Sequence, residues 1–192
     1  MSAYAFVTRW RIRAPIDAVW AAVFHAERWP EWWPGLQRVE ELAAGDGRYL
    51  GCGRRFVWKG ALPYTLTVEM TTTRVEPPTL LESAATGELV GRGVWRLAPV
   101  EGGTSVRYDW NVSPAKRWMR RLDLVARPVF RWNHDVVMRR GERGLKRLLE
   151  TAASMNRRDD ALEKRLWPDA GGEDTQHQGG QHDLGQAAHR DR

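Results

Sequence analysis

The sequence predicts an α+β fold in which a curved antiparallel sheet wraps around one long helix, with short helices near the N-terminus. Apolar residues over 128–149 recur at intervals of three and four, which is the spacing of one helix face. Between residues 36 and 112, short segments alternate between apolar and polar residues and are separated by turn signals. These turns are too short for crossover helices, so neighbouring strands are expected to pair antiparallel.

A change of period separates the first strand from the helices that follow. Residues 4–13 alternate, and the side expected to be buried carries Tyr4, Phe6, Thr8, Trp10 and Ile12. Pro15 suits the first turn of a helix that runs to about residue 26. Two prolines and three tryptophans within 28–35 allow at most one helical turn, around residues 30–33. Trp29 and Trp33 either close the end of the core there or cap the mouth of a pocket.

Six further strands and two helices are predicted downstream. The strands are expected at 36–42, 48–59, 64–75, 79–86, 89–97 and 104–112. A helix over 116–126 should be separated from the helix over 128–149 by a kink or break at Pro128. Gly141 and Gly144 each cost that helix about 0.5–1 kcal/mol relative to alanine, so we expect them to allow a close approach to the sheet. Space would then open toward the end of the helix that carries Phe130 and His134.

Length and composition favour one folded domain with a tail. Of the 192 residues, 42% are apolar, which is enough for a core. We expect a domain over 1–153 and a polar, disordered tail over 154–192. The single cysteine, Cys52, excludes an internal disulfide and fits a reducing compartment. No apolar run is long enough to span a bilayer and no signal-peptide pattern appears, so a soluble cytoplasmic protein is the default expectation.

The net charge of +6 raises the question of an anionic partner. Much of the excess is arginine on the last predicted helix, which we interpret as a solvated basic face. No nucleic-acid partner is expected, because the aromatic residues are predicted to be buried rather than interleaved with the basic ones. Peripheral membrane contact through the basic, amphipathic residues 116–147 stays open.

The predicted sheet and helix together indicate an internal space. A sheet of this length curls, and it encloses more volume than one helix can fill. Eleven tryptophans could fill that space, or they could line an apolar pocket with a few polar points, which suits a small hydrophobic ligand. The candidate ligand-binding residues are Trp33, Phe56, Trp58, Tyr64, Trp95, Tyr108, Trp110, Phe130, Asn133, His134, Val137 and Met138.

Three segments resemble one known superfamily. They are WRIRAPIDAVWAAV at 10–23, WPEWWP at 29–34 and NHDVVM followed by GxxGL within 133–145. The chain resembles the START-like (SRPBCC) superfamily over about residues 3–152, in particular its polyketide cyclase/dehydrase-like branch; the superfamily also includes Bet v 1 allergens and lipid-transfer domains. The resemblance implies the helix-grip fold, a seven-stranded antiparallel sheet around a C-terminal helix with a deep apolar cavity. It does not fix an activity, because the superfamily holds carriers, sensors, cyclases and hydrolases.

The chemistry of the site stays open at this stage. No nucleophile motif, metal-ligand spacing or phosphate-binding loop appears, so no metal or cofactor is expected. His134 lies on the apolar face of the last helix, where it is either a hydrogen-bonded core residue or a general acid or base. Asn133 could orient a ligand carbonyl.

The sequence leaves three functional hypotheses. In the favoured one, the protein is a carrier or binding protein for a small hydrophobic or aromatic, polyketide- or lipid-like ligand. Alternatively, it is a cyclase or aromatase that uses His134 and a cavity tyrosine such as Tyr64. The third possibility is a lipid or quinone carrier that docks on membranes. The sequence gives neither the ligand nor the oligomeric state.

Overall fold

The computed structural model describes residues 4–61, 64–115 and 123–166. Residues 1–155 form one compact unit, and a second unit begins at residue 156 and is helical as far as Leu166. Most of the helix predicted over 116–126, and the greater part of the predicted tail, lie outside the described residues.

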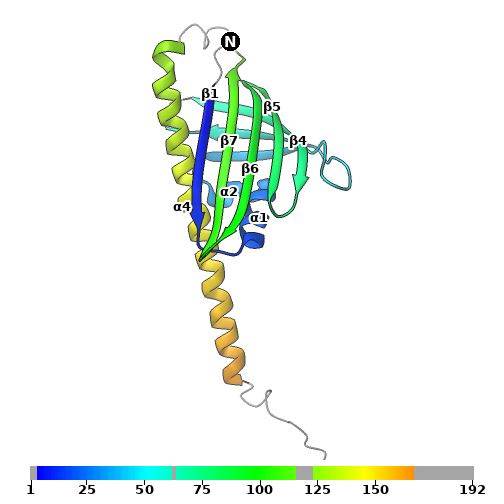
Figure 1. Ribbon diagram of the computed structural model, residues 1–192, viewed down its shortest axis with the longest axis vertical. Coiled ribbons are helices and arrows are strands. Elements are labelled where there is room, and N and C mark those ends of the chain that lie inside the picture. Colours follow the sequence, from blue (N-terminus) through cyan, green and yellow to red (C-terminus); the bar gives the residue numbers. More distant parts are fainter. Residues whose placement is uncertain (1–3, 62–63, 116–122, 167–192) are drawn as a thin grey trace, which may run out of the picture. The chain divides into compact units, whose positions relative to one another are not determined.

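Seven strands form one antiparallel sheet, as predicted, with the order β1-β7-β6-β5-β4-β3-β2 (Figure 1). The strands are β1 (Tyr4–Ile12), β2 (Leu36–Ala43), β3 (Gly53–Lys59), β4 (Thr65–Glu76), β5 (Leu80–Gly87), β6 (Leu89–Val100) and β7 (Gly103–Pro114). Strands β2 to β7 follow one another across the sheet, because each is joined to the next by a short connection. β1 and β2 lie at opposite edges, so the connection between them has to cross the whole sheet.

That connection consists of three short helices, where the change of period predicted them. They are α1 (Ile16–Phe24), the 3-10 helix η1 (Ala26–Arg28) and α2 (Trp29–Trp32). Val19 and Val23, on one face of α1, are fully buried. This burial holds the crossing segment against the end of the sheet, where α1 contacts β6 and β7.

Helix α4 (Asp123–Leu166) is longer than predicted and is not broken at Pro128. Of the predicted kink or break at Pro128, the break was wrong. A proline inside a helix removes one backbone hydrogen bond and crowds the preceding turn, but the residues on both sides of Pro128 keep helical geometry. Residues that line the cavity, such as Phe130, therefore belong to one continuous helix, and its part up to residue 155 runs along one side of the sheet (Figure 1).

The strand predicted to start at residue 48 starts only at Gly53, because the preceding residues form a loop. The Asp46 carboxylate Oδ1 accepts hydrogen bonds from the backbone N–H groups of Arg48 and Leu50, each at 2.8 Å. Tyr49 has a φ of +65°, which is incompatible with a strand. An aspartate side chain thus satisfies backbone donors that a strand partner would otherwise have to satisfy.

The two faces of the sheet differ as the alternation predicted. On β7, Val106, Tyr108, Trp110 and Val112 are buried, whereas Arg107 and Asn111 between them are exposed. The inward face and helix α4 enclose the core. The architecture is the helix-grip fold that the resemblance implied.

Candidate functional site

Trp33 lies at the centre of an aromatic cluster at one end of the core. Its ring contacts Trp10, Trp29, Trp32, Trp58 and Trp95 at centroid distances of 5.1–6.2 Å. The Trp33 Nε1–H donates to the carbonyl oxygen of Val137 in α4 at 2.9 Å. Trp33 is only 2% exposed and Trp29 only 6%, so they close the end of the core and do not cap a mouth at the surface.

Two glycines allow helix α4 to lie directly on the tryptophan segment (residues 29–34). A Cβ on Gly141 would lie 2.3 Å from Cε2 of Trp33, and one on Gly144 would lie 1.7 Å from the carbonyl oxygen of Trp32. Both distances are far below van der Waals contact. The close approach predicted for these glycines is therefore real, but its partner is the tryptophan segment and not the sheet.

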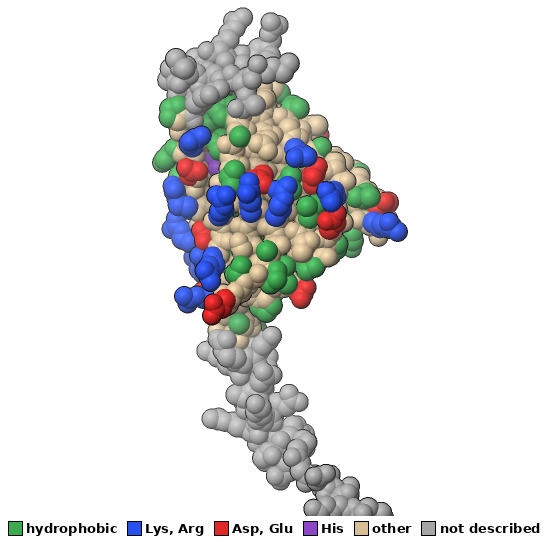
Figure 2. Space-filling model, viewed as in Figure 1, with side chains coloured by type: hydrophobic (Ala, Val, Ile, Leu, Met, Phe, Trp, Pro, Cys, Tyr) green, Lys and Arg blue, Asp and Glu red, His purple; other side chains and the backbone are tan. Residues whose placement is uncertain are grey.

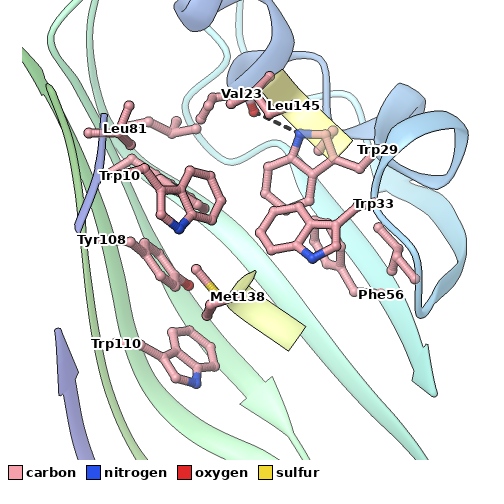
Figure 3. Packing of buried hydrophobic residues seen from close by; sticks show 14 of the residues in the cluster. Trp10, Val23, Trp29, Trp33, Phe56, Leu81, Tyr108, Trp110, Met138 and Leu145 are labelled. Carbon is pink, nitrogen blue, oxygen red and sulfur yellow. Dashed lines mark hydrogen bonds between the residues drawn. The ribbon is translucent and has the colours of Figure 1, made fainter. Parts of the chain in front are cut away.

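A cavity of about 140 Å³ lies between helix α4 and the inward face of the sheet. In Figure 3, Trp29 and Trp33 face Trp10, Tyr108 and Trp110 of the sheet, with Met138 of α4 between the two groups. Tyr64 also lines the cavity and is 39% exposed, so the cavity reaches the surface beside it. The N-terminal half of the helix therefore lines open space, as predicted.

All twelve candidate ligand-binding residues lie on the wall of this cavity. Sequence reasoning missed ten others: Tyr4, Phe6, Trp29, Gly60, Leu66, Val68, Met70, Leu89, Val112 and Pro114. The alternation of the strands would have placed several of them on the inward face of the sheet. Phe6 shares a strand face with Trp10, and Leu66 shares one with Tyr64. For Gly60 and Pro114 the sequence carried no such signal, because both lie at strand ends.

His134 is half-buried, and both of its ring nitrogens are shielded from solvent. Its imidazole stacks on Phe6 of β1, with ring centroids 4.2 Å apart and planes inclined by 15°. Among the described residues neither ring nitrogen has a hydrogen-bond partner, although the carboxylate oxygen Oδ1 of Asp135 lies 3.5 Å from Nδ1. Burial lowers the pKa of His134 below its ordinary value, and Asp135 offsets only part of that shift.

Asn133 fastens helix α4 to the β3–β4 connection. Its Oδ1 accepts the backbone N–H of Ala61 at 2.8 Å. A Cβ on Gly60 would lie 2.4 Å from the same oxygen, so the absence of a side chain at Gly60 makes room for the bond. The amide oxygen is thus engaged within the protein, and the donor that could orient a ligand carbonyl is the Nδ2 group of the same side chain.

Two of the tyrosines that line the cavity, Tyr64 and Tyr108, differ in their surroundings. Tyr108 is buried, and its ring stacks on Trp95 at 4.1 Å and on Trp110 at 5.8 Å. Burial raises its pKa, so its hydroxyl stays protonated. Burial, and then the nearby charge of Glu88, raise the pKa of the half-exposed Tyr64. Both phenols are therefore hydrogen-bond donors at neutral pH.

The charged residues that alternation placed outside do lie outside. On the outer face Arg55 pairs with Glu69 at 2.8 Å, and Asp109 pairs with Arg107 at 2.9 Å and also with Arg96. Figure 2 shows basic side chains in a row across this face, with acidic ones beside them. The residues that line the cavity include no Lys, Arg, Asp or Glu within the described chain.

A family model agrees with this architecture. Residues 5–150 match the family described as "Polyketide cyclase / dehydrase and lipid transport". The chain belongs to this family. The match covers the whole sheet, the crossing helices and the cavity-lining part of α4. No curated protein matches the chain.

Solved structures similar to this family member include ARO/CYC proteins and Ara h 8.0201. The di-domain ARO/CYC BexL from the BE-7585A biosynthetic pathway aligns with a TM-score of 0.62 at 20% identity, over 77% of this chain and 50% of BexL. The Zhui aromatase/cyclase from Streptomyces sp. R1128 aligns at 0.60 and 14% identity, over 90% and 100% of the two chains. Ara h 8.0201 aligns at 0.53 and 13% identity, over 78% and 99%.

These similarities establish the fold of the family member and not its activity, because the identities are low. The chain spans about half the length of the di-domain proteins BexL and StfQ. Family and fold together support a role in binding a hydrophobic ligand or in cyclisation. Among the described residues, no group of His, Cys, Asp and Glu could hold a metal ion, and no helix is long and apolar enough to cross a membrane.

Proposed function

We propose that the protein binds a small, largely apolar aromatic molecule in its cavity and acts as the binding or carrier protein for that molecule. The observation that supports the proposal is the chemistry of the wall. Aromatic rings from the sheet, from α2 and from α4 surround the space, and the few polar side chains among them are uncharged at neutral pH. Such a wall binds through apolar contact and ring stacking.

The size of the cavity limits the ligand. A cavity of about 150 Å³ holds a benzene molecule, and this one measures about 140 Å³. Its enclosed part therefore accepts one aromatic ring. A second ring extends toward the opening beside Tyr64, or it displaces flexible side chains such as Met70 and Met138, which lie on the wall.

Two experiments test the proposal. Native mass spectrometry of the protein purified from its own host should show a retained small molecule. Equilibrium dialysis should show saturable binding of naphthalene, which carries no polar group. The absence of both a retained molecule and naphthalene binding would overturn the proposal.

A matched pair of helix variants locates the binding. Val137 lines the cavity, whereas its neighbour Val136 is half-buried and does not. Val137→Phe fills the cavity and should weaken naphthalene binding at least about tenfold, which corresponds to about 1.4 kcal/mol. Val136→Phe should leave the affinity unchanged, and equal affinities in the two variants would place the binding elsewhere. Thermal unfolding checks that both variants are folded.

One observation favours the cyclase or aromatase alternative. A neutral imidazole, His134, and a protonated phenol, Tyr64, line the same cavity. Such a pair can remove a proton from a β-ketone carbon and protonate a carbonyl oxygen during aldol closure.

The test of this alternative separates binding from turnover. If the protein is a cyclase, His134→Ala keeps the affinity for the molecule identified by mass spectrometry, or for its open-chain precursor, and loses turnover. Unchanged turnover in His134→Ala would remove this residue from the reaction.

A further inference from the structure

The imidazole of His134 has hydrogen-bonding capacity that the protein does not use. A neutral imidazole carries one N–H donor and one lone-pair acceptor. Both nitrogens are buried, and neither has a hydrogen-bond partner among the described residues. An unsatisfied buried polar group is unfavourable. A ligand that supplied the missing partner would recover that free energy on binding.

The position of Asp135 decides which nitrogen is the acceptor. Asp135 Oδ1 lies 3.5 Å from Nδ1, so the carboxylate favours the tautomer with the proton on Nδ1. Nε2 then carries the lone pair. One face of the imidazole ring stacks on Phe6 of β1, a side chain that has no titratable group and no hydrogen-bond donor. The lone pair of Nε2 therefore lacks a hydrogen-bond donor, which a ligand could supply.

The rest of the wall argues against a charged ligand. Among the described residues that line the cavity there is no Lys or Arg, and burial keeps His134 neutral. A carboxylate in this space would lose its hydration without gaining a cation, which is strongly unfavourable. An uncharged hydroxyl group would lose less hydration and could donate to Nε2.

We infer that His134 selects an uncharged aromatic ligand that carries a hydroxyl group, which donates to Nε2, and that the cavity discriminates against aromatic acids. This inference rests on the proposed binding function. Nε2 is shielded from solvent, so a neighbouring side chain has to shift before the hydroxyl reaches it. Met138, one turn further along α4, also lines the cavity and has a flexible side chain of the kind that can shift. His134 is thus a specificity-determining residue, and no covalent step is involved.

Three naphthalene compounds of similar size test the inference. Naphthalene has no polar group, 2-naphthol adds a hydroxyl, and 2-naphthoate adds a carboxylate. In the unaltered protein 2-naphthol should bind more tightly than naphthalene, because its hydroxyl donates to Nε2. We expect this preference, measured at pH 7.5 as the dissociation constant of naphthalene divided by that of 2-naphthol, to fall about tenfold in His134→Leu. We also expect 2-naphthoate to bind at least about tenfold more weakly than 2-naphthol to the unaltered protein. An equal ratio in both proteins, or 2-naphthoate binding as tightly as 2-naphthol, would overturn the inference.

Two controls keep the test decisive. His25 is surface-exposed and does not line the cavity, so His25→Leu should leave the ratio unchanged. If His134→Leu does not fold, ¹⁵N NMR of the unaltered protein gives the answer, because 2-naphthol should shift the Nε2 resonance of His134 and naphthalene should not. An Nε2 resonance that is the same with both compounds would contradict the inference. If none of the three compounds binds, the proposed binding function fails. If they bind but His134→Leu does not change the ratio, only the inference about His134 fails.

Discussion

Two halves of the apolar part of helix α4, residues 130–138 and residues 141–149, carry the same kind of apolar face but meet different surroundings. From Gly141 to Leu149 the helix lies on the tryptophan segment, and Leu145 is fully buried. From Phe130 to Met138 it faces the cavity, and His134 has no hydrogen-bond partner there. One half has solid protein as its partner, and the other has space that a ligand can occupy.

This difference shows what an apolar helical period does and does not say. The period requires that the face be buried, and both halves satisfy it. Whether the opposing surface touches the helix depends on single residues. Gly141 and Gly144 bring the backbone against the tryptophan segment, whereas the preceding turns carry larger side chains that contact β1 and line the cavity.

The largest predicted effect comes from Gly144→Ala. The new Cβ would lie 1.7 Å from the backbone carbonyl of Trp32, so the helix or the tryptophan segment has to move. We expect a loss of about 3 kcal/mol or more in the free energy of unfolding, at the upper end of the usual cost of overpacking. Urea denaturation followed by circular dichroism measures it.

A glycine in open space provides the control for Gly144. No atom lies within 4 Å of a Cβ built on Gly47, so Gly47→Ala should be neutral or slightly stabilising. If Gly144→Ala were as stable as Gly47→Ala, the helix could not lie as close to the tryptophan segment as described.

Gly141→Ala should cost less, about 2 kcal/mol. The added Cβ meets the Trp33 ring at 2.3 Å, and a side chain can shift more readily than a backbone. The shift should also weaken the hydrogen bond from Trp33 Nε1 to the Val137 carbonyl. Near-ultraviolet circular dichroism should report the altered tryptophan packing together with the lower midpoint, and an unchanged spectrum would contradict the contact.

The sequence predicted the sheet because the period of two is a local property that burial on one face enforces. All twelve residues that the sequence proposed for the cavity line it. The period of two identified several of them, since Tyr108 and Trp110, for example, share one strand face. Sequence reasoning failed where a distant partner decides the outcome. The close approach at Gly144 depends on Trp32, more than a hundred residues earlier in the chain, and no local pattern identifies that partner.

The polar residues of the site were the hardest to interpret from sequence. Asn133 and His134 are neighbours on one helix, yet one makes a hydrogen bond to Ala61 and the other makes none. The difference arises from Gly60 on the β3–β4 connection and Phe6 on β1, which bring a backbone N–H to the first side chain and an apolar ring to the second. Only tertiary structure places these groups.

Asn133→Ala is expected to have a moderate effect, a loss of about 1 kcal/mol, because it removes one hydrogen bond. The backbone N–H of Ala61 would exchange faster with solvent, which hydrogen exchange followed by NMR can measure. Asn111→Ala, at an exposed position on the outer face of β7, is the matched control and should change neither stability nor exchange. Equal exchange of Ala61 in the unaltered protein and in Asn133→Ala would contradict the role of Asn133.

His134→Leu should have the smallest effect on the free energy of unfolding at neutral pH. It also tests most directly the difference between the two halves of the apolar part of helix α4. Replacing a buried polar group that lacks a partner with an apolar one should leave stability at pH 7.5 unchanged or slightly raised. The pKa of His134 in the folded protein lies below its ordinary value of about 6.5. As the pH falls below that value, the unfolded chain takes up the proton before the folded protein does, so the unaltered protein loses stability.

His134→Leu lacks this proton uptake, so its stability relative to the unaltered protein should increase as the pH falls from 7.5 to 5. Asp135 is the acidic group next to the ring, and it reduces this difference without reversing it, because burial is the larger cause of the shift. Urea unfolding of both proteins across this pH range measures the difference. If the two stability curves stay parallel, the imidazole is hydrated in the folded protein, and the N-terminal half of the helix does not face the dry, ligand-sized space that distinguishes it from the other half.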